Sequence, residues 1–215
     1  MHWPLWDRAV RTIHWYLPLA IAFMWWSGEK GLYQWHSWVG YSLIVAVATR
    51  IFWGFIGSQT ARFSTFLVGP SAVVAYLKGG QFLGAGHNPL GGWATVILLL
   101  VVLLQGLSGL FVSDDVMFEG PLTFWGGDWS GLFAQWHEFN WKVLQVLMLI
   151  HLLAVGYHQW YRKESLIGAM WWGKTEHRFG LSKPKNTSLA LAVALIIVGL
   201  LFLLVALAPQ APSYY

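Results

Sequence analysis

The sequence predicts an all-α integral membrane protein, and both its composition and its patterning indicate that fold class. Of its 215 residues, 57% are hydrophobic and only 10% are charged, whereas a soluble domain carries about 25% charged residues. The apolar residues gather in long blocks instead of alternating with polar ones. A membrane interior explains both the missing charge and the block pattern.

Five apolar blocks are long enough to cross a bilayer as helices. A crossing helix needs about 20 mostly apolar residues, and a helix satisfies its backbone polar groups within lipid. We expect the first four crossings to form one domain over residues 1–180 and the last to be an additional C-terminal helix over residues 187–208. The first four blocks are residues 9–28, 35–56, 92–112 and 138–161.

Charged residues predict the orientation of this bundle. Most Lys and Arg precede the first block or follow the second and fourth blocks, and the positive-inside rule places these segments in the cytoplasm. The segment 113–136 falls on the other side and contains four acidic residues without Lys or Arg. We therefore expect a cytoplasmic N-terminus and an external C-terminus. The acidic residues are Asp114, Asp115, Glu119 and Asp128, and the basic ones are Arg8, Arg11, Arg62, Lys78, Arg162, Lys163, Lys174, Arg178, Lys183 and Lys185.

Two histidines in the fourth block point in the same direction. His137 and His151 are 14 residues apart, which is close to four helical turns and gives a rise of about 21 Å. Leu144 lies between them on the same stripe. Because an ionisable residue inside a membrane span is costly, it marks a functional site by default. One helix face is therefore expected to serve two sites, one toward each side of the membrane.

Each of these histidines has a facing histidine at a matching depth. His36 begins the second block on the outer side, and His14 lies early in the first block on the inner side. We pair His36 with His137 and His14 with His151, because the opposite pairing asks one metal to bridge most of the membrane thickness. His87, before the third block, is a competitor for the inner position. Ordinary packing is the alternative for any single histidine.

Two imidazoles on one iron are the ligand set of a b-type haem. The chain has no cysteine, which excludes disulfides, iron–sulfur clusters and covalently attached c-type haem. Two histidines per iron leave no open axial position, which favours electron transfer over oxygen chemistry. The expected fold is a four-helix transmembrane bundle that encloses two b haems, with a fifth C-terminal transmembrane helix. No residue is assigned to catalysis.

Further residues are assigned to the surroundings of these haems. Gly40 and Gly54 offer clearance for a flat macrocycle, and helix packing through small residues is the alternative. Arg50 lies near the inner end of the second block, where a guanidinium can hold a haem propionate with help from Arg11. Topology alone also explains both cations. His158 continues the histidine stripe two turns further, and we expect it to contact a propionate or a quinone.

The chain resembles a known family, the bacterial di-haem cytochromes b of the cytochrome b561 and nickel–iron hydrogenase b-subunit group. The resemblance covers about residues 5–180 and is carried by WDRAVRTIHW around His14, WHSWVGYSLIVAVATRIFWG from His36 to Arg50, HNPLGGWATVILLLVVLLQGLSGLF in the third block, and WHEFNWKVLQVLMLIHLLAVGYHQWYRKESLIGAMWWGK around His137 and His151. It implies four haem ligands on the first, second and fourth helices. It also implies a bacterial inner-membrane protein that exchanges electrons between the quinone pool and a periplasmic redox protein, such as a c-type cytochrome or a hydrogenase.

Two other functions stay open at this point. A superoxide:quinone oxidoreductase on the same scaffold needs cations on the outer face, where Lys30 and Lys142 are available. A haem-free membrane transporter or anchor, with histidines as a proton relay, is compatible with the composition. The dispersed cations form no basic tract, so no nucleic-acid partner is expected. The acidic 113–136 segment favours an electron carrier that meets a basic partner.

Overall fold

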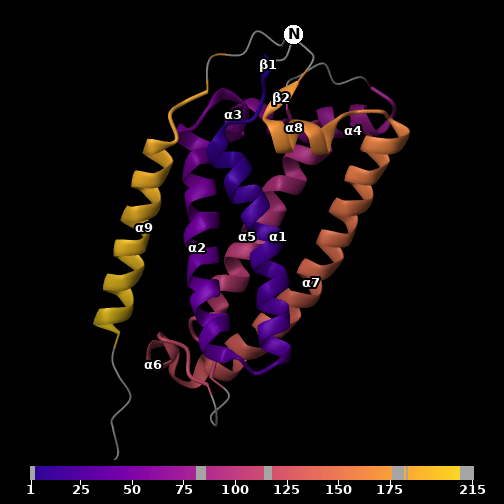
Figure 1. Ribbon diagram of the computed structural model, residues 1–215. Coiled ribbons are helices and arrows are strands. Elements are labelled where there is room, and N and C mark those ends of the chain that lie inside the picture. Colours follow the sequence, from indigo (N-terminus) through magenta and orange to yellow (C-terminus); the bar gives the residue numbers. More distant parts are fainter. Residues whose placement is uncertain (1–2, 81–85, 114–117, 176–181, 183, 209–215) are drawn as a thin grey trace, which may run out of the picture.

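Five long helices dominate the part of the chain that the computed structural model describes, which is residues 3–80, 86–113, 118–175, 182 and 184–208. They run roughly side by side, and the chain passes back and forth along them (Figure 1). Each corresponds to one of the five apolar blocks. The helices are α1 (Arg8–Glu29), α2 (Tyr33–Ile56), α5 (Pro89–Gly109), α7 (Ser130–Gly156) and α9 (Ser188–Leu207).

Short elements close the two ends of the bundle. We call the end that carries β1 the basic end and the end that carries α6 the acidic end (Figure 1). At the basic end, β1 pairs antiparallel with β2, so that Trp3 lies opposite Thr175. The acidic end carries α6 (Thr123–Gly126) and η2 (Gly127–Trp129). The basic end carries β1 (Trp3–Pro4), η1 (Gln59–Ala61), α3 (Phe63–Phe66), α4 (Pro70–Leu77), η3 (Tyr157–Tyr161), α8 (Leu166–Trp172) and β2 (Lys174–Thr175).

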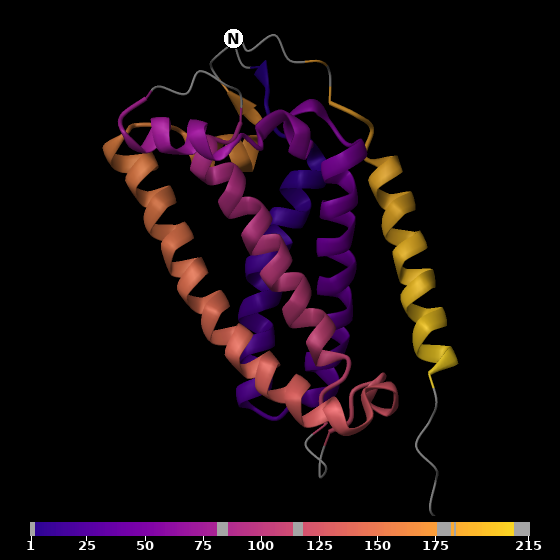
Figure 2. The same ribbon diagram turned by 180° about the vertical axis from the view of Figure 1, so that it is seen from behind.

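The long helices pack in a definite order. α1 packs on α2, α2 on α5, and α5 on α7, while α9 packs on the outside of α2. Seen from behind, α9 lies at the edge of the molecule, and α7 leans away from the other helices toward the basic end (Figure 2). The first four long helices therefore enclose a common interior, and α9 stands apart from it.

Four helical segments in the described part of the chain are long and apolar enough to cross a membrane. They are Tyr33–Ile56, Pro89–Gly109, Thr123–Tyr161 and Ser188–Leu207. α1 has a comparable length and lies along α2, but it is not among them. Its first two turns carry Arg8, Arg11 and His14, which lower its apolar content.

A buried carboxylate organises the basic end. The Asp7 side chain is 3% exposed, and one of its oxygens accepts the Val10 N–H at 2.8 Å, which caps α1. Its other oxygen accepts the indole N–H of Trp53 at 2.8 Å, and Trp53 is itself 1% exposed on α2. Asp7 thus starts α1 and holds it against α2 at the same time.

An apolar cluster fills the middle of the bundle. Leu144 of α7 is 2% exposed and packs among buried side chains from the other three helices. Hydrophobic attraction between helices is weak in lipid, so close packing of this kind supplies much of the helix association. The residues with Leu144 in this central cluster are Ala20, Leu43, Val47, Leu99 and Val102.

The Asp7→Ala variant is expected to lose about 1–3 kcal/mol of stability, because it leaves the Trp53 indole and the first turn of α1 without an acceptor. The measurement is the thermal or denaturant unfolding of the purified protein in detergent. Asp7→Asn should lose less, since its amide oxygen still accepts. Asp128→Ala is the matched control, because Asp128 is exposed in η2. Equal stability of Asp7→Ala and Asp128→Ala would contradict the expectation.

Candidate functional site

The four histidines from the sequence lie in two facing pairs. The His36 ring on α2 and the His137 ring on α7 have centroids 6.3 Å apart, with planes at 65°. The His14 ring on α1 and the His151 ring on α7 have centroids 6.5 Å apart, with planes at 57°. The first pair lies toward the acidic end and the second toward the basic end, and the central cluster with Leu144 separates them.

The spacing within each pair fits one metal ion between two imidazoles. A metal–imidazole bond is about 2 Å long and the ring centre lies about 1.1 Å behind the nitrogen, so two rings on one ion have centres about 6 Å apart. Both observed separations agree with that value. The residues present therefore fit bis-histidine ligation of a haem iron at each level.

The tautomer of His36 is set by its neighbours. Its Nδ1 lies 2.9 Å from the Met24 carbonyl oxygen, which can only accept, so Nδ1 carries the proton. The buried Ser27 hydroxyl donates to the same carbonyl at 3.1 Å and lies 3.3 Å from Nδ1. With the proton held on Nδ1, the lone pair on Nε2 is available to a metal.

His137 is held in the same way by a different helix. The Ser108 hydroxyl of α5 donates to the Gln105 carbonyl at 3.0 Å, so its oxygen accepts from His137 Nδ1 at 3.1 Å. The proton is again on Nδ1 and Nε2 is again available. A hydrogen bond of this kind raises the basicity of a ligating imidazole and fixes its plane.

Two glycines make room for these rings. A Cβ atom at Gly109 would lie 3.1 Å from His137 Cε1, and one at Gly28 would lie 3.4 Å from the His36 ring. Each glycine directly follows the serine that contacts the same histidine: Ser27–Gly28 lies in the last turn of α1, and Ser108–Gly109 lies in the last turn of α5. Sequence reasoning missed both pairs, and the Ser-Gly dipeptide that recurs near the acidic end of two helices was the available signal.

A cavity of about 340 Å³ adjoins the His36–His137 pair. Its volume lies in the range of small-molecule sites, which is about 300–1,000 Å³. The lining is mostly apolar, and Gly40 contributes to it together with Gly28 and Gly109. A Cβ at Gly40 would lie 3.2 Å from Met24 Cε, so this glycine keeps the cavity wall open.

The His14–His151 pair has a different environment. The Nδ1 atom of His14 is buried and has no hydrogen-bond partner in the described part of the chain. Arg50 is 5% exposed, donates to the Ala61 carbonyl at 3.3 Å and lies over the Phe63 ring at 5.7 Å. Its charge acts on His14. A buried guanidinium beside an imidazole pair fits the propionate role expected of Arg50.

Other assigned residues have further contacts. Arg11 donates to the carbonyls of Met170 and Trp171, so it holds the end of α8. At Gly54 a Cβ would lie 2.2 Å from the Phe63 ring, so this glycine admits α3 against α2. Both contacts account for these residue types without a haem.

His87, the competitor for the inner position, packs elsewhere. Its ring lies between Phe66, at a centroid distance of 4.4 Å, and Trp6, at 4.8 Å. Burial, and then the Arg50 charge, lowers the pKa of His87 to about 3, so this side chain is neutral at physiological pH. The histidine that faces His151 is His14.

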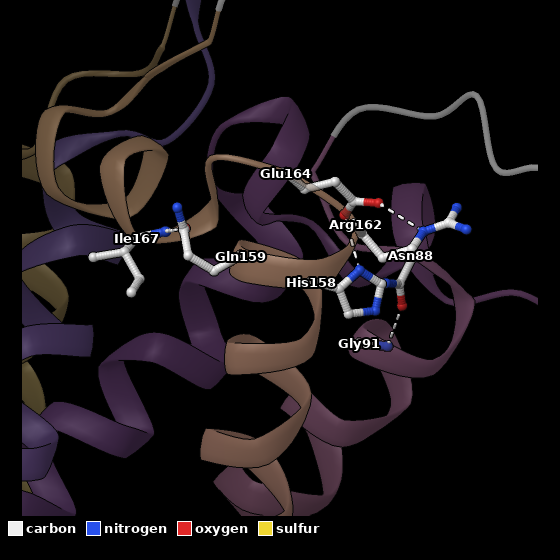
Figure 3. Close-up of polar contacts among 7 residues, drawn as sticks. All are labelled: Asn88, Gly91, His158, Gln159, Arg162, Glu164 and Ile167. Carbon is white, nitrogen blue, oxygen red and sulfur yellow. Dashed lines mark hydrogen bonds and ion pairs between the residues drawn. The ribbon is translucent and has the colours of Figure 1, made fainter.

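His158 lies beyond both pairs, at the basic end. It pairs with Glu164 and lies next to Asn88 (Figure 3). Four other residues from the sequence analysis, Asp114, Asp115, Arg178 and Lys183, lie outside the described residues.

A bundle of apolar helices with imidazoles facing each other across its interior defines a membrane-bound b-type cytochrome. The family model for prokaryotic cytochrome b561 matches residues 5–173. This covers more than half of the chain, so the chain belongs to that family, and the resemblance inferred from the sequence is confirmed. No curated protein and no solved structure matches it. The protein is an integral membrane cytochrome of the electron-transfer type, and haem b is its cofactor.

The Gly109→Leu variant is expected to displace the His137 imidazole and to lower the haem content of the purified protein. The reason is the 3.1 Å approach of a Cβ atom to that ring. Haem per chain, from the pyridine haemochrome spectrum, is the measurement. Gly199→Leu in α9 is the control, since a Cβ there meets nothing within 4 Å. Full haem content in Gly109→Leu would show that the ring position is not critical.

Proposed function

We propose that this chain is a di-haem cytochrome b that carries electrons between the membrane quinone pool and a periplasmic redox protein, such as a c-type cytochrome or a hydrogenase. The observation that carries the proposal is the presence of two imidazole pairs, 6.3 and 6.5 Å between centroids, toward opposite ends of one helix. A carrier that connects the two faces of a membrane needs a redox group near each face.

The chain's own residues have distinct parts in this proposal. His36 and His137 hold one haem, and His14 and His151 hold the other. The haem supplies one-electron exchange with both axial positions filled, which favours outer-sphere transfer. Arg50 neutralises a propionate of the inner haem, and Arg11 contributes positive charge while it fixes α8. Gly40 and Gly109 leave space for the outer macrocycle.

The proposed topology has five crossings, with the basic end in the cytoplasm. The described cations of that end include Arg8, Arg11, Arg62, Lys78, Arg162, Lys163, Lys174 and Lys185, as the positive-inside rule requires. Residues 1–180 then form the di-haem domain, α1 is a crossing in spite of its lower apolarity, and α9 is the additional crossing. This topology places the protein in the bacterial inner membrane with its N-terminus inside and its C-terminus outside.

The acidic end supports a basic redox partner. Among the described residues, four exposed carboxylates lie there, and two of them, Glu29 and Glu138, line the cavity beside His36 and His137. The four carboxylates are Glu29, Glu119, Asp128 and Glu138. A surface charge of one sign speeds the approach of an oppositely charged partner.

Superoxide, the alternative substrate, is an anion and needs cations at the acidic end. One of the two lysines proposed for that role, Lys142, is paired with Glu138 at 2.8 Å.

The two haem sites should separate by mutation. His137→Ala is expected to remove the outer haem and to leave the inner one, and His151→Ala to do the reverse, so each variant keeps about half of the reduced-minus-oxidised α-band. Difference spectra and redox titration of the purified protein are the measurements.

His87→Ala is the matched control for those variants, because it removes a buried histidine that packs on Phe66 and Trp6. It should retain both haems. The pairing is wrong if His87→Ala loses the inner haem while His14→Ala keeps it, and the redox proposal fails if the wild-type protein binds no haem.

Electron exchange with a basic c-type cytochrome should depend on salt. Raising the ionic strength from about 0.01 to about 0.2 M is expected to slow the second-order rate about 10-fold or more, because it screens the acidic end. Replacing Glu119, Asp128 and Glu138 together by neutral amides should slow the rate at low salt, whereas Lys78→Gln at the other end should not. Stopped-flow spectroscopy measures both, and faster haem reduction by superoxide than by the cytochrome would favour the enzyme alternative.

A further inference from the structure

We propose that His158 and Glu164 form a proton-exchange pair that connects a quinone reaction at the basic end with cytoplasmic water. The inference rests on the proposed function, in which the chain exchanges electrons with the membrane quinone pool, and it places that exchange at the basic end, opposite the periplasmic partner. It assigns the protons of that reaction to two named side chains.

The pair is built where α7 ends (Figure 3). His158 Nδ1 lies 2.9 Å from one carboxylate oxygen of Glu164, and the Glu164 N–H donates to the His158 carbonyl at 3.0 Å. The other ring nitrogen, Nε2, lies 3.5 Å from the Asn88 amide nitrogen. Asn88 is itself fixed, because its side-chain oxygen accepts the Gly91 N–H at 2.7 Å and caps α5.

The exposure of the two side chains differs in the direction that a relay requires. The Glu164 side chain is 42% exposed and the His158 side chain is 15% exposed. A proton from water therefore reaches the carboxylate first and the shielded imidazole second. An imidazole can take up a proton on one nitrogen and release one from the other, and the two nitrogens of His158 lie toward Glu164 and toward Asn88.

The backbone around His158 departs from a regular α-helix. The last turn of this segment, η3, is a π-helix over Tyr157–Tyr161, and such turns are rare and frequent at functional sites. Lys163, just before Glu164, has φ +58°, which is uncommon for a residue other than glycine. This sharp turn brings the Glu164 carboxylate back onto His158.

The surrounding charged and titratable groups leave the pair intact. Arg162 Nε lies 3.7 Å from the other Glu164 oxygen, and the Tyr157 ring meets the His158 ring edge-on with centroids 5.5 Å apart. From α4, Tyr76 also senses the pair, since burial and then the Glu164 charge raise the pKa of its hydroxyl, so Tyr76 stays protonated.

The proton balance of the step is simple. Reduction of one quinone to its quinol takes up two electrons and two protons, and the electron-transfer activity proposed above supplies the electrons. In the structure the Asn88 amide donates to Nε2, so Nδ1 carries the proton toward the Glu164 carboxylate. In quinol oxidation each quinol proton passes to Nε2, the Nδ1 proton passes to Glu164, and Glu164 releases it to water. Quinone reduction runs the same steps backward and takes up two protons from the cytoplasm.

The test is haem reduction by a short-chain quinol, followed by stopped-flow in the haem-loaded protein in detergent. Glu164→Gln and His158→Gln are expected to slow this rate about 10-fold or more at pH 7, because loss of a positioned acid–base group removes about 10²–10⁴-fold. Millimolar imidazole or formate should restore part of the rate in Glu164→Gln. Glu164→Asp should keep a larger share of it. The haem spectrum and reduction by dithionite should not change.

Gln159→Ala is the matched control, because Gln159 makes the neighbouring side-chain bond of the same turn, to the Ile167 N–H at 3.1 Å. It should react like the wild type. If Gln159→Ala and Glu164→Gln slow haem reduction by quinol equally and small acids or bases rescue neither, the pair only stabilises the local structure, and the proposal is wrong. It is also wrong if Glu164→Gln and His158→Gln both react at the wild-type rate. If the wild-type protein itself is reduced by dithionite but not by quinol, the quinone part of the proposed function fails, and the relay falls with it. If His158→Gln loses haem, Glu164→Gln and its rescue decide the outcome.

Discussion

The rest of the structure depends on one constraint, which is that α7 presents imidazoles to two different helices at two depths. His137 meets His36 of α2 and His151 meets His14 of α1, so both α1 and α2 must lie within ring contact of the same stripe. Opposite chain directions in α1 and α2 satisfy this requirement with each histidine near the start of its helix. The Asp7 carboxylate, which caps α1 and binds Trp53 of α2, keeps those two helices in register.

The two pairs share a geometry but differ in their support. At the acidic end both imidazoles donate from Nδ1, one to a carbonyl and one to a hydroxyl, and both rings lie against glycines. At the basic end His14 Nδ1 has no such partner among the described residues, and a buried Arg50 lies nearby. Hydrogen bonds and charges near a haem set its potential. In the proposed di-haem arrangement, the two levels therefore give unequal redox environments.

Much of this could be predicted from the sequence, because lipid leaves few options. The apolar blocks predict the long helices, and the 14-residue spacing in the fourth block predicts which imidazoles meet. Haem ligation by those four residues is still a prediction. What the pattern could not predict are contacts set by distant parts of the chain. Gly54 faces Phe63 of α3, Arg11 binds the end of α8, and Ser108 reaches His137, and each of these partners lies in a different helix.

The central cluster around Leu144 has an electrical consequence. It is apolar and tightly packed, so little charge within it can screen the field across the membrane. In the di-haem arrangement an electron that passes from one level to the other moves about 21 Å, through a hydrocarbon core about 30 Å thick. Moving one electron across the whole membrane changes its free energy by about 2.3 kcal/mol per 100 mV of membrane potential. The distribution of electrons between the two levels should therefore respond to membrane voltage, in a direction fixed by which end of α7 faces the cytoplasm.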